Sequence, residues 1–135
     1  MMFDHVVIVH SLKDAQSALK AALADGRPVT LMSSPGAALY AGCGWWKSLI
    51  ASARASYPTV PGQDILDCAD GTGVAMAALR IGICRLVLWP AAPGREAVVA
   101  IAHRMNGFVL DRPPITAHSL PGKRPLTGDK SRQPG

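Results

Sequence analysis

Three residues with reactive side chains each lie at the end of a short apolar run of the sequence. His10 ends the run at residues 5–10, and Asp67 and Cys68 end the run at residues 64–68. A histidine and a carboxylate in one crevice can act as general acid and base, and a thiol facing a helix N-terminus can become a nucleophile. These residues define an enzyme hypothesis, with His10 and Asp67 as the acid/base pair if their strands are neighbours, or with Cys68 as the thiol.

Two glycine-marked junctions between an apolar run and a helical pattern suit binding instead. They read Ser-Ser-Pro-Gly at residues 33–36 and Asp-Cys-Ala-Asp-Gly-Thr-Gly at residues 67–73. The first amides of a helix lack partners within the helix and attract anions. Neither junction completes a GxxxxGK[ST] or GxGxxG motif, so helix capping by Asp70 or Thr72 is the competing interpretation. The residues expected to bind a ligand here are Ser33, Ser34, Gly36, Asp70, Gly71, Thr72 and Gly73.

Tryptophans are expected to flank this crevice. Trp45 and Trp46 are adjacent, and side chains of adjacent helical residues point about 100° apart, so the two rings cannot share one buried stripe. Trp46 fits the inward stripe, which leaves Trp45 for a pocket mouth or for a homodimer interface. Trp89 follows an apolar run and is expected at the same crevice. The inward stripe is expected to comprise Leu39, Cys43, Trp46, Leu49, Ile50 and Ala53.

The elements that must position these residues follow an alternating pattern. Apolar runs predict strands, and a 3.6-residue periodicity predicts helices. The predicted strands are residues 5–10, 28–32, 64–68, 85–89 and 108–110, and the predicted helices are residues 12–25, 36–56, 73–81 and 93–106. This β-α-β order indicates parallel strands whose polar carboxyl ends meet at one edge.

The predicted fold class is therefore α/β, a three-layer sandwich of flavodoxin-like style with about five mostly parallel strands. The alternative is a half (β/α) barrel that is completed by dimerisation. Residues 73–82, leading into residues 85–88, resemble the helix-glycine-strand connection of (β/α) proteins, including half-barrel segments of aldolase-like enzymes. The resemblance concerns the fold alone, because no lysine lies on a predicted strand to form a Schiff base.

Length and charge divide the chain into a domain and a tail. The 135 residues fit one domain at residues 1–111, and the Pro/Gly-rich residues 112–135 are expected to form a disordered tail. The net charge is +5, but residues 1–111 hold nine Lys/Arg against eight Asp/Glu, whereas residues 112–135 hold five against one. Since the expected domain lacks a basic face, nucleic acid is not an expected partner.

Cysteine usage and apolar content indicate a location in the cytoplasm. The three cysteines are odd in number and have neither CxxC spacing nor a nearby histidine cluster, which argues against a disulfide framework or zinc site. No segment has the pattern of a signal peptide or the ~20 apolar residues that cross a membrane.

The inventory of polar residues favours binding over catalysis, because no nucleophile, base and orienting group form a set. The expected function is binding of a small phosphate- or carboxylate-bearing metabolite at the carboxyl ends of the strands, and the enzyme hypothesis is the alternative. No motif names a cofactor.

Overall fold

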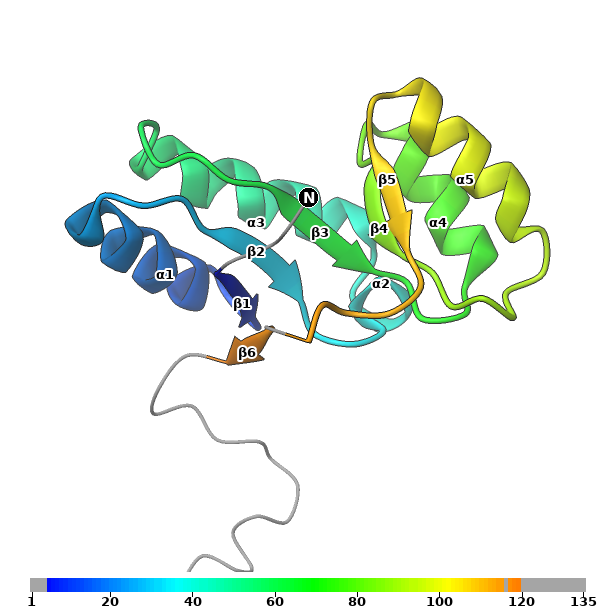
Figure 1. The fold of residues 1–135 in the computed structure, drawn as a ribbon, viewed down its shortest axis with the longest axis horizontal. Coiled ribbons are helices and arrows are strands. Elements are labelled where there is room, and N and C mark those ends of the chain that lie inside the picture. Colours follow the sequence, from blue (N-terminus) through cyan, green and yellow to red (C-terminus); the bar gives the residue numbers. More distant parts are fainter. Residues whose placement is uncertain (1–4, 116, 120–135) are drawn as a thin grey trace, which may run out of the picture.

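The computed structural model describes residues 5–115 and 117–119, which form one parallel sheet and a set of helices (Figure 1). The strands are β1 (Val6–Val9), β2 (Thr30–Ser33), β3 (Asp64–Asp67), β4 (Arg85–Val87), β5 (Phe108–Leu110) and β6 (His118–Ser119). The helices are α1 (Leu12–Asp25), α2 (Ala37–Tyr40), α3 (Cys43–Ser56), α4 (Thr72–Arg80) and α5 (Arg95–Arg104).

Helix α1 begins and ends where its local signals predict. The Ser11 side chain accepts a hydrogen bond from the Asp14 amide at 3.2 Å, and Gly26 ends the helix in a left-handed conformation with φ of 66°. A serine cap satisfies one of the first amides of a helix, and glycine takes positive φ without steric cost. Both signals lie next to the helix in sequence, which is why the prediction of residues 12–25 is confirmed.

The single helix expected at residues 36–56 is instead two helices, α2 and α3. The chain leaves the helical conformation at Gly42, whose φ of 90° suits glycine and not residues with a Cβ. As a result Leu39 belongs to a different helix from Trp46 and is 52% exposed, so its place in the inward stripe was predicted wrongly. Trp46, Leu49 and Ala53 are buried, as predicted.

The strand order, which the sequence leaves open, is β5-β4-β3-β2-β1-β6, and every pair is parallel. From β1 to β5 each strand lies beside the one before it. When every β-α-β connection has the same handedness and each new strand is added on the same side of the last, the connecting helices all lie on one face of the sheet. Accordingly α1 contacts α3, α3 contacts α4, and α4 contacts α5 (Figure 1). These helices share one apolar cluster with Leu31, Leu66 and Leu86.

The other face of the sheet carries a smaller apolar cluster. It comprises Val6, Met32, Ile65 and Val87, and Ala117 from the segment after β5 packs against it. This segment leads across to β6, which pairs with β1 (Figure 1). The sheet therefore extends past residue 111, the expected end of the domain. The remainder of the predicted tail, residue 116 and residues 120–135, lies outside the described residues.

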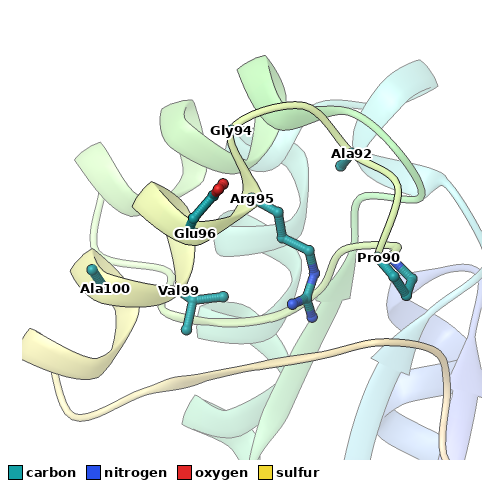
Figure 2. Close-up of a pocket in the computed structure, with 7 residues that line it drawn as sticks. All are labelled: Pro90, Ala92, Gly94, Arg95, Glu96, Val99 and Ala100. Carbon is teal, nitrogen blue, oxygen red and sulfur yellow. The ribbon is translucent and has the colours of Figure 1, made fainter.

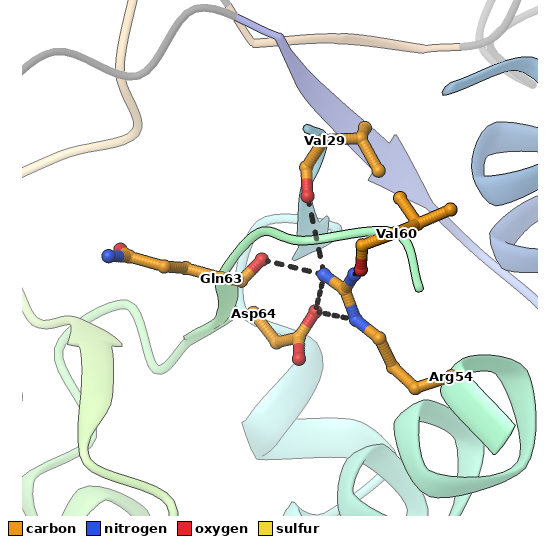
Figure 3. A network of polar contacts seen from close by, with 5 residues as sticks. All are labelled: Val29, Arg54, Val60, Gln63 and Asp64. Atoms are coloured by element: carbon orange, nitrogen blue, oxygen red, sulfur yellow. Dashed lines mark hydrogen bonds and ion pairs between the residues drawn. The ribbon is translucent and has the colours of Figure 1, made fainter. Parts of the chain in front are cut away.

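One arginine fastens the edge at which the strands begin, here called the amino-terminal edge. Arg54, near the end of α3, donates from Nη2 to Asp64 Oδ1 at 2.7 Å and from Nη1 to Val60 O at 3.1 Å (Figure 3). Nη2 also lies 3.3 Å from the carbonyl oxygens of Val29 and Gln63. A planar guanidinium suits such a set of acceptors, because its donors are fixed in one fork. Arg54 therefore joins α3 to the entrances of β2 and β3.

A close backbone contact lies beside this network. Gly62 has φ of 147°, and a Cβ at this position would lie 1.8 Å from Val29 O. No side chain fits at that distance, so the approach of the two chain segments requires glycine.

The predicted fold class is confirmed: the protein is an α/β sandwich in which every strand pair is parallel, and the sheet does not close into a barrel. Among the described residues, no helix has the length and apolar character needed to cross a membrane.

Candidate functional site

The polar strand ends meet at one edge of the sheet, here called the carboxyl edge. Because all strand pairs are parallel, the residues that end or follow β1, β2, β3, β4 and β5 lie along this edge. They include His10, Ser33, Asp67, Trp89 and Asp111. Ligands of open α/β sheets bind outside the carboxyl ends of the strands, so this edge is the place to search for a site.

Asp67 is the anchor between β3 and the turn after β2. Its Oδ1 accepts hydrogen bonds from the Gly36 amide at 3.1 Å and the Ala69 amide at 2.9 Å. Its own amide donates to Ser33 Oγ at 2.9 Å. Burial raises the pKa of Asp67 above its usual 3.8, and the two amide hydrogen bonds lower it by less. Asp67 is 1% exposed. Its carboxylate therefore serves to hold the backbone at Gly36 and Ala69 in place.

The first glycine-marked junction uses its amides internally. The Gly36 amide donates to Asp67, and the Ala37 amide donates to Ser34 O at 3.0 Å. The Ser34 hydroxyl lies 2.5 Å from the hydroxyl of Tyr40. The structure thus brings Ser33, Ser34 and Gly36 together with Asp67 in one network, and these amides already have partners.

His10 and Asp67 come from strands that are not neighbours. β2 lies between β1 and β3, and strands are spaced about 4.8 Å apart, so β1 and β3 are separated by about 10 Å. His10 is exposed, and its amide donates to Asp14 Oδ2 at 2.9 Å. The condition under which His10 was expected to pair with Asp67 is therefore not met.

The Cys68 thiol is fully buried beneath the carboxyl edge. Burial, together with the nearby Asp67 and Cys43, raises its pKa to about 12. A thiol with this pKa is protonated at neutral pH, whereas a nucleophilic cysteine has a lowered pKa and access to substrate. This environment suits a cysteine that packs as a small apolar side chain.

The second glycine-marked junction leaves helix amides without internal partners. Gly71 is the N-cap of α4 and no side chain caps the helix there, so the expectation that Asp70 or Thr72 caps it is wrong. The Ala75 amide donates to Gly71 O, which places the amides of residues 72–74 before the first hydrogen bond of the helix. A Cβ on Gly71 would lie 2.6 Å from Leu39 Cδ2, so this turn is closely packed.

The N-terminus of α5 lies next to that of α4. The Thr72 hydroxyl donates to Pro93 O at 2.5 Å, and a Cβ on Gly94 would lie 3.8 Å from Thr72 Cγ2. Gly94 is the N-cap of α5, with φ of 71° and no side-chain cap. Two helix N-termini without side-chain caps, each the positive end of a dipole, therefore adjoin across residues 93–94.

A cavity of about 570 Å³ opens at the N-terminus of α5 and is lined by Pro90, Ala92, Gly94, Arg95, Glu96, Val99 and Ala100 (Figure 2). Arg95 supplies its positive charge. Its Nε donates to Leu88 O at 2.8 Å, and Nη2 bonds Asp111 Oδ1 at 2.7 Å. Nη1 makes no hydrogen bond with another described residue. Figure 2 shows the Glu96 carboxylate directed away from the Arg95 guanidinium.

Trp45 and Trp89, the two tryptophans expected at this crevice, have rings that are only partly covered. Trp45, in the first turn of α3, is partly buried against the core, and its ring centre lies 5.8 Å from that of Trp46. Trp89 is 46% exposed, and its amide donates to Ala69 O at 2.7 Å. Neither lines the 570 Å³ cavity. The homodimer contact expected through Trp45 stays a prediction.

Sequence reasoning missed Arg95, the arginine that lines the cavity at this edge. An arginine in the first turn of a helix is usually solvated, so its type alone gives no signal. The surrounding sequence does give a signal, because Pro90, Pro93 and Gly94 mark a third glycine-containing junction after a strand.

The fold and this edge define an α/β protein with a cavity, lined by Arg95 and Glu96, at the carboxyl ends of parallel strands. No protein-family model matches the chain, and no curated protein matches its sequence. Within residues 5–115 and 117–119, no group of three or more His, Cys, Asp or Glu side chains could hold a metal ion.

Proposed function

We propose that the protein binds a small anionic ligand, bearing a phosphate or carboxylate group, at the carboxyl edge of its sheet. One observation carries the proposal: Arg95 lines a 570 Å³ cavity at the N-terminus of α5, which has no side-chain cap. A guanidinium with a free Nη1 beside the positive end of a helix dipole favours an oxyanion.

The neighbouring N-terminus of α4 also favours a negatively charged ligand, because no side chain caps it. Gly71, Thr72 and Gly73 do not line the cavity, but they adjoin it across the Thr72 contact with Pro93. A ligand with two anionic groups, such as a sugar phosphate carrying a carboxylate, would place one at Arg95 and the other at the amides of α4.

The enzyme alternative has less support at this edge. Cys68 is buried with a raised pKa, and β2 separates His10 from Asp67. Asp67 already accepts two backbone hydrogen bonds, which favours an anchoring role. The proposal is therefore binding without chemistry at these three residues.

Thermal unfolding of the full chain with inorganic phosphate or glycerol phosphate tests the proposal. A ligand that binds only the folded state raises the melting temperature as its concentration exceeds the Kd. Arg95→Gln should abolish this rise, whereas Arg104→Gln, at the other end of α5, should preserve it. An unchanged response of Arg95→Gln, or no response of the wild-type chain to either anion, would refute the proposal.

A further inference from the structure

A second cavity, of about 290 Å³, lies on the other side of the molecule from the carboxyl edge. It is enclosed by the middle of α3, the turn that joins α4 to β4, and the first residues of β3 and β4. None of the residues that line it belongs to the candidate site described above. The two cavities are therefore separate in the fold.

Apolar side chains form much of the wall of this second cavity. They include Trp46, Ile50 and Ile83. Ile50 and Ile83 are partly exposed and supply the accessible apolar surface, and Trp46, which is 1% exposed, packs behind them in the core. Apolar walls favour a ligand with a compact apolar body.

Two cations line the same cavity. Arg85, the first residue of β4, is partly buried, and its side chain makes no hydrogen bond or ion pair with another described residue. Lys47 Nζ donates to Ile81 O at 2.6 Å, which uses one of its three donors. Both side chains therefore retain donors for an anion.

The one acidic residue of the cavity is already engaged. Asp64 Oδ1 accepts two hydrogen bonds from Arg54, at 2.7 and 3.2 Å. Burial raises the pKa of Asp64, and Arg54 and then Arg85 act against that rise. Because Arg54 balances Asp64, the charges of Arg85 and Lys47 remain in excess.

We propose that this cavity binds a small monocarboxylate with a single compact apolar body. The carboxylate accepts hydrogen bonds from Arg85 and Lys47, and the apolar body packs against Ile50 and Ile83. A neutral ligand would leave the guanidinium without a partner, and inorganic phosphate would leave the apolar walls in contact with water. The combination of the walls and the cations thus selects for an organic acid of about the size of benzoate.

Calorimetric titration of the full-length Arg95→Gln variant, which lacks the other proposed anion site, with benzoate and phenylacetate tests this proposal, and benzamide is the comparison ligand. We expect saturable binding of a carboxylate and binding of benzamide that is weaker by about tenfold or more, because the charge-assisted hydrogen bonds are lost. Arg85→Gln should weaken carboxylate binding by a similar factor. Arg80→Gln removes the same charge from an exposed position of α4 that does not line the cavity, and it should leave the affinity unchanged.

A second variant keeps the test decisive if Arg85→Gln does not fold. Ala51 lines the cavity from the exposed side of α3, so Ala51→Phe fills the space without entering the core, and it should abolish binding. Equal affinity for benzamide and benzoate, unchanged affinity in Ala51→Phe, or no carboxylate binding at millimolar concentration would overturn the proposal. The phosphate-dependent rise in melting temperature assigned to Arg95 should persist in Ala51→Phe, so failure of one site is distinguishable from failure of the other.

Discussion

The two edges of the sheet differ in how they use their polar groups. At the amino-terminal edge, Arg54 satisfies four acceptors from the segments that enter β2 and β3, and the backbone at Gly62 presses against Val29. At the carboxyl edge, two helix N-termini have no side-chain cap, and Arg95 retains a free Nη1 beside a cavity. Because Arg54 holds the strands together at the amino-terminal edge, the backbone and side-chain N–H donors at the carboxyl edge can remain available for a ligand. The Arg54 network therefore stabilises the entrances of β2 and β3, whereas the free donors at the starts of α4 and α5 support the anion site proposed at the carboxyl edge.

The largest expected effect is at Gly62. Gly62→Ala places a Cβ 1.8 Å from Val29 O at a φ that disfavours any side chain, so the two segments must separate. We expect a loss of more than about 3 kcal/mol in the free energy of unfolding, measured by urea titration.

Gly44→Ala is the matched control for that substitution. Gly44 lies inside α3, and no atom lies within 4 Å of a Cβ built there. Alanine should stabilise the helix by about 0.5–1 kcal/mol. If both variants changed stability equally, close packing at the amino-terminal edge would not be the cause.

Removal of the Arg54 side chain is expected to have the next largest effect. Arg54→Ala leaves the carboxylate of Asp64 and three backbone carbonyls without their donors, which should cost about 3 kcal/mol. Arg27→Ala removes an arginine whose ion pair with Asp25 is largely exposed, and it should change the free energy of unfolding by less than about 1 kcal/mol. Equal losses in the two variants would show that the buried network adds nothing.

At the carboxyl edge, Asp67 is expected to contribute through its two amide partners. Asp67→Ala leaves the amides of Gly36 and Ala69 without an acceptor and should cost about 2 kcal/mol. Asp67→Asn keeps a side-chain oxygen for both amides and should cost less. Identical losses in the two variants, measured by urea titration, would contradict the anchoring role.

The pH dependence of stability gives the smallest expected effect. Because the folded-state pKa of Asp67 is raised, the folded protein holds this proton more tightly than the unfolded chain does. Its favourable contribution is complete below the usual pKa of 3.8 and is lost as the pH rises through the raised value. Asp67→Asn should therefore gain stability relative to the wild-type chain between about pH 4 and pH 7. A difference that stays constant over this range would mean that burial of the charge has no energetic consequence.

The sequence predicts this fold best where the signals are local. Ser11 and Gly26 define α1, and apolar runs define five strands, because each signal lies within or next to its element. The sequence left the break at Gly42 as one of three alternatives, since glycine inside a helical pattern indicates a kink, a close contact or a short loop equally well. β6 has only two residues and no periodicity to detect.

The candidate site was predicted only as an edge of the sheet. Parallel topology brings the strand ends together, but which amides stay free depends on partners far away in sequence. The Asp67 carboxylate accepts a hydrogen bond from the Gly36 amide, 31 residues away in sequence. The amides of the first glycine-marked junction therefore have partners, whereas no side chain caps the second. Arg95 was missed because its contacts with Leu88 and Asp111 exist only after α5 has packed beside β4 and β5.

The measurement that tests the central claim most directly is a titration of the ¹⁵N-labelled chain with inorganic phosphate, followed by amide chemical shifts. If an anion binds at the carboxyl edge, the largest shifts will fall on the amides of residues 72–74 and 94–97, at the starts of α4 and α5. The amides around Arg54 and Gly62 at the amino-terminal edge will change little. Shifts confined to the amino-terminal edge, or no saturable shifts at the two helix N-termini, would contradict the account.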